Sequence, residues 1–153
     1  MSTEKYDRQR FLGALINIVA FRMRHKFDLR LREYGLDISV WPALACLWEQ
    51  DGVPQARIGE LLGVPGYAMS RGVDRLEGAG LVTRRSDPEN RRVRRVFLTE
   101  AGRAIESTLV PLANAVNEEM LAPLAPAQQN ALLALLRQLV EHTDGSSGIQ
   151  SPA

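Results

Sequence analysis

The chain has 153 residues, 45% of them hydrophobic and 24% charged, which fits one ordinary globular domain. Its net charge of +1 conceals a basic middle segment, because residues 54–98 carry +4 and residues 99–153 carry −4. The N-terminus has no apolar signal core, and the apolar run at 12–21 is too short and amphipathic to span a membrane. There is a single cysteine, so a disulfide framework within the chain is excluded. These features exclude a secreted disulfide-rich protein and a membrane protein, and we expect a cytoplasmic one.

Residues 7–34 are predicted to form one long helix that ends at Gly35. Its apolar side chains recur at helical spacing, at Leu12, Leu15, Ile16, Val19, Met23 and Phe27. At 1.5 Å per residue this helix would be about 40 Å long, more than a domain of this size needs for its own core. The surplus apolar surface predicts a second subunit, so we expect a dimerisation helix here.

The next helix is expected from Ser39, which can cap its N-terminus, to about residue 50. Pro42 is tolerated there because it falls in the first turn. Trp41 and Trp48 share one face of this helix. Two interpretations stay open for Trp41, namely core packing and the wall of a ligand pocket.

A helix-turn-helix is predicted from two further segments. Residues 55–62 form a short helix ended by Gly63, and a second helix runs from Pro65 to Gly78. One stripe of the second helix is apolar, with Met69, Val73 and Leu76. The opposite stripe carries hydrogen-bonding groups, at Tyr67, Ser70, Arg71 and Asp74, with Arg75 beside them.

A β-hairpin is predicted after this helix, with strands at 81–86 and 93–98 and a turn at 87–90. Six arginines lie between positions 84 and 95 against only Asp87 and Glu89, a local net charge of +4. Such a density of positive charge on a two-stranded ribbon is unfavourable, because the arginines repel one another unless an anion lies nearby. Duplex phosphate is the commonest intracellular polyanion. The alternative is a charged hairpin that is merely solvated.

The C-terminal part is predicted to be helical. Thr99 is a suitable N-cap for a helix to about residue 121, in which Pro111 should cause a kink. Pro126 then starts a last helix with a leucine-rich face, made of Leu132, Leu135, Leu136, Leu139 and Val140. Residues 144–153 have the composition of a disordered tail.

Four fragments in this region resemble the core motif of the MarR family of bacterial transcriptional regulators. They are V-D-R-L-E at 73–77, G-L-V-x-R at 80–84, D-P-x-x-R-R at 87–92 and L-T-E-A-G at 98–102. No fragment is specific alone, but the four together in this order are. Pro54 and Gly59 depart from the family pattern, which often has a capping hydroxyl and an alanine at these positions, so the helix at 55–62 is expected to be weak.

The resemblance implies a mainly α fold with one β-hairpin: a winged helix-turn-helix at 39–98 between dimerisation helices at 7–34 and 100–142, all within one domain at 1–143. It implies a homodimer that binds a palindromic double-stranded DNA operator. The expected DNA-binding residues are Tyr67, Ala68, Ser70, Arg71, Arg75, Arg91, Arg92 and Arg94. Asp74 is expected to anchor an arginine of the wing, because phosphate would repel an unpaired carboxylate.

The resemblance also implies a small-molecule effector, often phenolic or aromatic, that lowers operator affinity, and it favours a repressor over an activator. Arg22, His25 and Trp41 are placed at the effector site by their positions in the expected helices alone. An alternative function is an architectural or protein-binding winged helix, which weak salt dependence of duplex binding would distinguish.

Other classes of function have no support in the sequence. No nucleophile, paired-carboxylate or phosphate-loop motif indicates an enzyme, and we expect no cofactor and no metal. His25 and His142 are isolated from other ligands and are expected to be ordinary packed or surface residues. Cys46 lies on a helix predicted to be buried, which favours an inert thiol.

Overall fold

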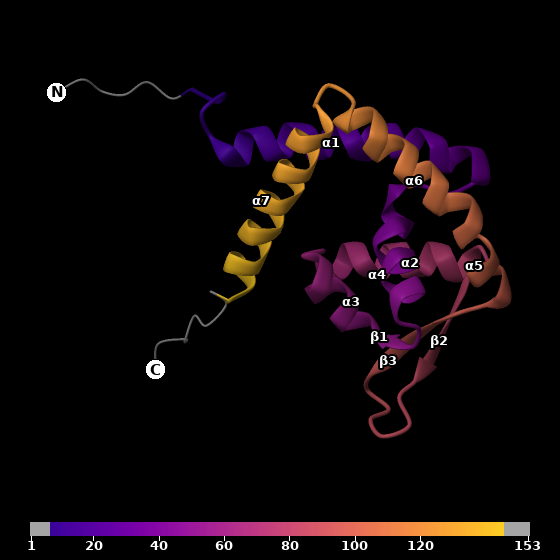
Figure 1. The fold of residues 1–153 in the computed structure, drawn as a ribbon. Helices are drawn as coiled ribbons and strands as arrows, with labels where there is room; N and C mark the ends of the chain where they lie inside the picture. The colour runs from indigo at the N-terminus through magenta and orange to yellow at the C-terminus, as the bar shows by residue number, and fades with distance from the viewer. Residues whose placement is uncertain (1–6, 146–153) are drawn as a thin grey trace, which may run out of the picture. The chain divides into compact units, whose positions relative to one another are not determined.

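The computed structural model describes residues 7–145. Over these residues the protein is mainly helical with a small antiparallel sheet (Figure 1), and the chain divides into two compact units, one up to Val116 and one from Asn117. The elements in chain order are α1 (Leu12–Leu31), η1 (Arg32–Tyr34), η2 (Ile38–Val40), α2 (Trp41–Glu49), β1 (Val53–Pro54), α3 (Gln55–Leu62), α4 (Gly66–Gly78), β2 (Val82–Ser86), β3 (Arg94–Leu98), α5 (Glu100–Ala104), α6 (Glu106–Leu121) and α7 (Pro126–Gly145), where η marks a 3₁₀ turn.

Helix α1 begins five residues later than the sequence predicted. Asp7 accepts a hydrogen bond from the backbone N–H of Gln9, and its carbonyl accepts one from Arg10, so residues 7–10 form a turn instead of helix. The predicted stop at Gly35 is confirmed. Gly35 has φ +70, and the N–H of Leu36 closes the helix end by bonding to the carbonyl of Leu31.

The cap of the next helical segment is Asp37, not Ser39. A 3₁₀ turn precedes α2, which moves the cap two residues towards the N-terminus, and Asp37 Oδ1 accepts a bond from the N–H of Ser39 at 2.9 Å. The hydroxyl of Ser39 is buried and finds no partner among the described residues.

Helices α3 and α4 form the predicted helix-turn-helix. The apolar stripe of α4 is confirmed, because Met69, Val73 and Leu76 are all buried. Pro54 precedes α3 without any side-chain cap, as its departure from the family pattern implied. At Gly59 a methyl group would lie 2.9 Å from the carbonyl oxygen of Val64, so this glycine lets the turn pass close to α3.

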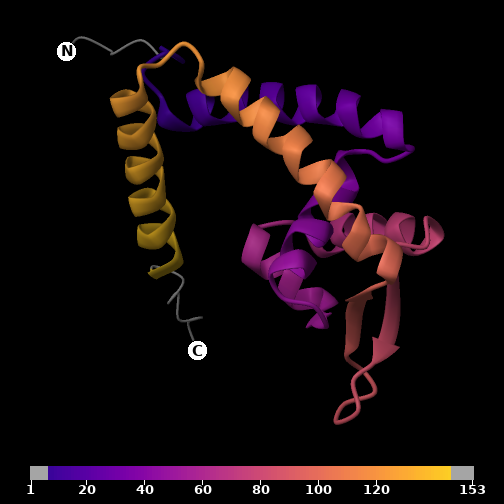
Figure 2. The ribbon, with the colours of Figure 1, turned by 45° about the vertical axis from the view of Figure 1, so that its right-hand side comes forward.

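The sheet has three strands where the sequence predicted two. Its order is β1-β3-β2, and the additional strand β1 pairs Val53 with Val96. The hairpin of β2 and β3 pairs Val82 with Leu98 and Ser86 with Arg94. Figures 1 and 2 show its tip extending away from the helices of the first unit.

Thr99 caps the N-terminus of α5 as predicted, since Thr99 Oγ1 accepts a bond from the N–H of Gly102 at 3.0 Å. The predicted single helix is divided into α5 and α6, and the interruption lies at Ile105. Pro111 lies inside α6, and a kink there remains a prediction.

In the second unit, α7 runs from Pro126 to Gly145, so two residues assigned to the tail are helical. The rest of the predicted tail, residues 146–153, lies outside the described residues. Within this unit the amide of Gln129 closes the turn before α7 by donating to the carbonyls of Leu121 and Leu124.

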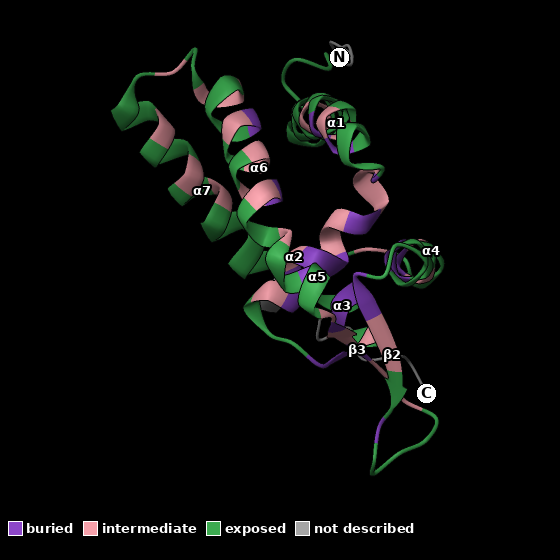
Figure 3. Ribbon diagram, turned by 90° about the vertical axis from the view of Figure 1, so that its right-hand side faces the viewer, coloured by how far each residue is buried: buried purple, intermediate pink, exposed green. Residues whose placement is uncertain are grey.

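The core of the first unit surrounds α2, α4 and the sheet. Its fully buried side chains are Leu31, Val40, Leu44, Leu47, Ile58, Val73, Leu76, Val82, Val96 and Leu109. Most of α1, by contrast, is exposed in the single chain (Figure 3), including Leu12, Leu15, Ile16 and Val19 of its apolar stripe. Leu135 and Val140 of α7 are each 59% exposed.

Candidate nucleic-acid interface

The face of α4 opposite its buried stripe carries the expected recognition residues. Tyr67 is 73% exposed, Ala68 and Ser70 are half-buried, and Arg71 is exposed. The guanidinium group of Arg71 makes no hydrogen bond or ion pair that the described residues show. A helix that is fixed by its apolar stripe and leaves an arginine unengaged on the other side can present that arginine to a base edge.

Arg84 joins the hairpin to α4. Its side chain is 18% exposed and donates from Nη1 to Glu77 at 2.8 Å and from Nη2 to Asp74 Oδ1 at 2.6 Å. Its Nε donates to Gln55 Oε1 of α3 at 2.9 Å. The wing arginine next to Asp74 is therefore Arg84, whose head is turned towards the helices.

Asp87 organises the tip of the hairpin. Its Oδ1 accepts hydrogen bonds from the backbone N–H groups of Glu89 and Asn90 at 2.8 and 3.2 Å, and its Oδ2 pairs with Arg95 Nε. Arg95 Nη1 also donates to the carbonyl of Gly52 at 2.9 Å, next to β1. The Arg95 hydrogen bond, followed by that of Glu89, lowers the pKa of Asp87.

The six arginines thus divide into two groups. Arg84 and Arg95 are engaged by carboxylates, and Arg85 lies over the ring of Phe97, 5.0 Å from its centroid. Arg91, Arg92 and Arg94 are exposed at the tip, and the only described side-chain bond among them joins Arg94 Nη1 to Ser86 Oγ at 3.1 Å. The charge available to a ligand lies at this tip.

We predict that Asp87→Ala loosens the tip without unfolding the domain, because it removes three bonds local to the turn. Amide hydrogen exchange of residues 89 and 90 should become faster, while Glu89→Gln, an exposed control, should leave it unchanged. The pKa of Asp87 is lower in the folded protein than in the unfolded chain. The contribution of Asp87 to the stability of the fold is therefore fully present above its ordinary pKa of 3.8, and it is lost as pH falls through the lowered value. Unchanged exchange in Asp87→Ala would refute this role.

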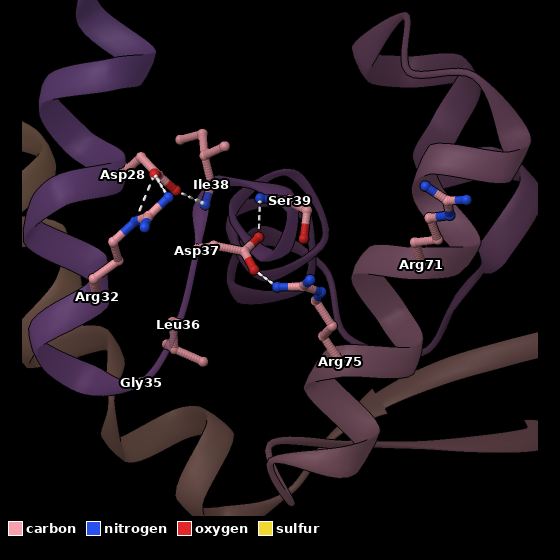
Figure 4. Close-up of a pocket in the computed structure, with 9 residues that line it drawn as sticks. All are labelled: Asp28, Arg32, Gly35, Leu36, Asp37, Ile38, Ser39, Arg71 and Arg75. Carbon is pink, nitrogen blue, oxygen red and sulfur yellow. Dashed lines mark hydrogen bonds and ion pairs between the residues drawn. The ribbon is translucent and has the colours of Figure 1, made fainter.

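Arg75, also expected at the interface, forms an ion pair with Asp37, the residue that caps η2 (Figure 4). Arg71 lies on the same side of α4, and together with Arg75 and Asp37 it lines a hollow at the surface. No bond joins Arg71 to the other residues drawn in Figure 4. Two neighbouring arginines of α4 are therefore in different states, one paired within the chain and one not.

The three residues assigned to the effector site are not gathered in one cavity. His25 stacks on Phe21, with ring centroids 6.4 Å apart, and lines a hollow of about 420 Å³ with Arg24, Asp28 and Ile38. Arg22 is exposed and does not line this hollow.

Trp41 lies in an aromatic cluster instead. Its ring meets Phe27 edge to face at 4.6 Å between centroids and Trp48 at 5.7 Å. Trp48 Nε1 in turn donates to the carbonyl of Gly102 at 2.9 Å. This geometry supports the core-packing interpretation of Trp41.

Cys46 is buried at 8% exposure, and burial, with the charge of Glu49 second, raises the pKa of its thiol. Since the thiolate is the reactive form, we predict that Cys46→Ala binds DNA as the wild type does. Peroxide should affect the two proteins equally in a gel-shift assay. Oxidation that abolishes DNA binding only in the wild type would show that Cys46 is a sensor.

Over residues 7–143 the structure shows no group of three His, Cys, Asp or Glu side chains placed to hold a metal ion. Within the described part of the chain, every helix is too short or too polar to cross a bilayer.

Sequence reasoning missed residues that fix the hairpin to its surroundings, namely Gln55, Glu77 and Asp51, and it missed the pairing of Asp87 with Arg95. Asp51 Oδ1 accepts the N–H of Leu98 at 2.8 Å, and its Oδ2 pairs with Arg103 at 2.6 Å. The turn at 87–90 itself was predicted, since aspartate favours the first position of a turn.

Comparison with known proteins gives consistent results. Residues 34–93 match the family model described as the MarR family. The crystal structure of a MarR family transcriptional regulator from Silicibacter pomeroyi is similar at 30% identity and a TM-score of 0.75, covering 89% of this chain and 92% of that one. The transcriptional repressor Mb2911 of Mycobacterium bovis is 27% identical over 128 residues, which are 84% of this chain and 92% of the relative.

A third relative is similar in fold. It is BpsR of Bordetella bronchiseptica, which matches with a TM-score of 0.79 at 23% identity. The DNA binding of BpsR is regulated by 6-hydroxynicotinic acid. The similarity covers 90% of this chain and 98% of BpsR.

Proposed function

This chain belongs to the MarR family of non-enzymatic, DNA-binding transcriptional regulators, and we propose that it is a cytoplasmic repressor that binds a palindromic operator and is released by a small molecule. One observation supports DNA binding most directly: Arg71 on α4 is unengaged, and the arginines at the tip of the hairpin are exposed. The name of the Mycobacterium bovis relative supports repression.

The two surfaces have different proposed roles. Helix α4 lies in the major groove, where Arg71 pairs with guanine O6 and N7 and Ser70 contacts a neighbouring base or phosphate. Tyr67 and Ala68, at the start of the helix, contact the DNA beside them. Arg91, Arg92 and Arg94 meet phosphates or enter the adjacent minor groove.

A homodimer supplies the two-fold symmetry that a palindrome requires, with half-site centres about 10 base pairs apart. The exposed apolar residues of α1, with Phe21 at 71% and Leu12 at 56%, support this assembly. The separate leucine-rich face of α7 supports it as well, since Leu135 is 59% exposed.

We predict that sedimentation equilibrium gives twice the 17.0 kDa mass of one chain, because each subunit leaves these faces uncovered. Deletion of residues 1–30 should cause unfolding or aggregation, since it removes most of α1. A stable, well-folded monomer at micromolar concentration would contradict the proposal.

The effector is proposed to be a small phenolic or aromatic molecule, which the regulation of BpsR by 6-hydroxynicotinic acid supports. The hollow beside His25 is its proposed site, because it joins an imidazole, the Arg24 guanidinium and the exposed ring of Phe21. Arg22 and Trp41 remain weaker candidates, since neither lines that hollow.

Selection of duplexes from a random library tests the function. We expect enrichment of an inverted repeat and its release by at least one member of a panel of hydroxylated aromatic acids. No enrichment would favour the alternative of a protein-binding winged helix, and enrichment without release by any panel member would contradict the effector proposal as stated.

A further inference from the structure

The segment that links α1 to α2, residues 35–40 and called here the α1–α2 linker, is held by both α1 and α4. On the α1 side, Asp28 Oδ1 accepts the backbone N–H of Ile38 at 2.8 Å. Asp28 Oδ2 pairs with Arg32 at 2.8 Å, and the Ile38 hydrogen bond is the main cause that lowers the pKa of Asp28. The position of the linker is therefore fixed to α1.

On the α4 side, the linker makes two contacts that lie one helical turn apart. At Gly72 the two backbones meet, since a methyl group there would lie 2.3 Å from the carbonyl oxygen of Ser39. At Arg75 the guanidinium group pairs with Asp37, whose other carboxylate oxygen caps η2 (Figure 4). The first contact sets how closely the linker approaches α4, and the second joins the exposed side of the helix to the linker.

Asp37 and Arg75 lie between two surface hollows. A hollow of about 730 Å³ lies on one side, lined by Arg71 and Arg75 of α4 together with Asp28 and Ser39. A second hollow of about 280 Å³ adjoins the pair and is lined by Gly35, Val40 and Gly78. The pair therefore adds a polar contact on the exposed side of α4, near Arg71, to the buried stripe that fixes the helix in the core.

We infer that Asp37 is a positioning residue for DNA recognition, which acts by holding Arg75 and through it the orientation of α4. This inference rests on the proposed function. It reassigns Arg75 from a DNA contact to the partner of Asp37. Through Asp28 and the linker, it also connects the recognition helix mechanically with α1, the proposed dimerisation helix.

Charge alone and a positioning role predict opposite effects on DNA binding when Asp37 is removed. Loss of a negative charge beside a DNA-binding helix should strengthen binding to any duplex, and so should release of Arg75 to contact phosphate. A positioning role predicts weaker binding to the operator in spite of the favourable change in charge. The sign of the effect therefore separates the two roles.

The test uses Asp37→Asn, Arg75→Gln and the double variant in the full-length protein. Asparagine retains an oxygen that can accept the N–H of Ser39, so the cap of η2 is preserved while the ion pair is lost. Glu60→Gln is the control, because it removes the same charge from an exposed pair with Arg57 on α3.

Binding is measured on the selected operator and on a scrambled duplex. We expect each single variant to lose about three- to tenfold in operator affinity with no comparable loss on the scrambled duplex, and the double variant to lose no more than either single one. Glu60→Gln should bind both duplexes at least as tightly as the wild type. Operator binding by Asp37→Asn that equals or exceeds that of the wild type would overturn the inference, and so would additive losses.

Amide exchange of residues 72–78 in the free protein gives a readout that does not depend on DNA. These amides should exchange faster in Asp37→Asn and Arg75→Gln than in the wild type or Glu60→Gln, and unchanged rates would overturn the inference. A wild type without preference for any duplex would instead refute the proposed function, whatever the exchange rates show.

Discussion

Gly102→Ala is expected to destabilise the protein by about 2 to 4 kcal/mol, the range of a severe overpacking change. A methyl group at this position would lie 2.0 Å from the carbonyl oxygen of Leu81 and 3.2 Å from Leu98 Cδ2. The first contact is with backbone, which cannot move aside as a flexible side chain does. It would separate α5 from the start of the hairpin.

Two hydrogen bonds make the site less able to adjust. The N–H of Gly102 donates to Thr99 Oγ1, and its carbonyl accepts from Trp48 Nε1 at 2.9 Å. A shift of this residue therefore disturbs both the N-cap of α5 and the aromatic cluster of α2. This contact gives a physical reason for the glycine in the L-T-E-A-G fragment.

Gly78→Ala is the matched control, because a methyl group there meets nothing within 4 Å and alanine favours helix by up to about 1 kcal/mol. Urea unfolding at a fixed protein concentration measures both variants. We expect a clearly lower midpoint for Gly102→Ala and an equal or higher one for Gly78→Ala. Equal midpoints for Gly102→Ala and the wild type would contradict the packing described for α5.

Arg71→Ala and Arg91→Ala are expected to impair DNA binding in different ways. If Arg71 pairs with a guanine, its loss should cost about 1 to 3 kcal/mol on the operator and far less on a scrambled duplex. If Arg91 meets a phosphate, its loss should weaken binding to both duplexes alike and reduce the salt slope by about one.

Isotherms for both variants on the two duplexes at several salt concentrations check this division. Arg85→Ala is a useful control among the wing arginines, because its guanidinium lies over Phe97 and not at the tip. Equal losses for Arg71→Ala and Arg91→Ala on both duplexes would remove the division of roles between α4 and the hairpin.

Local patterns were sufficient to predict most helices and the hairpin. Met69, Val73 and Leu76 recur at helical spacing, and this spacing alone placed them in the core. The bounds of α3 were predicted correctly because Gly63, with φ +60, is a strong helix stop. Strand β1 was missed because two residues carry no periodicity, and their pairing with β3 depends on tertiary contact.

The roles of the individual arginines could not be predicted from the sequence. Arg84 and Arg91 look alike in a basic run, but Arg84 reaches Asp74 and Glu77 of α4, ten and seven residues away in the chain. Which guanidinium group is engaged depends on how β2 lies against α4. This packing is a tertiary contact, and the local sequence does not indicate it. For the same reason the pairing of Arg75 with Asp37 could not be predicted from the sequence.

We propose above all that α4 and the hairpin form a DNA interface that reads sequence. The most direct measurement is the affinity of the wild type for its selected operator and for a scrambled duplex of equal length, each across a series of salt concentrations. We expect tighter binding to the operator at every salt concentration, with affinity for both duplexes falling steeply as salt rises. Equal affinity for the two duplexes, or binding that salt does not weaken, would contradict it.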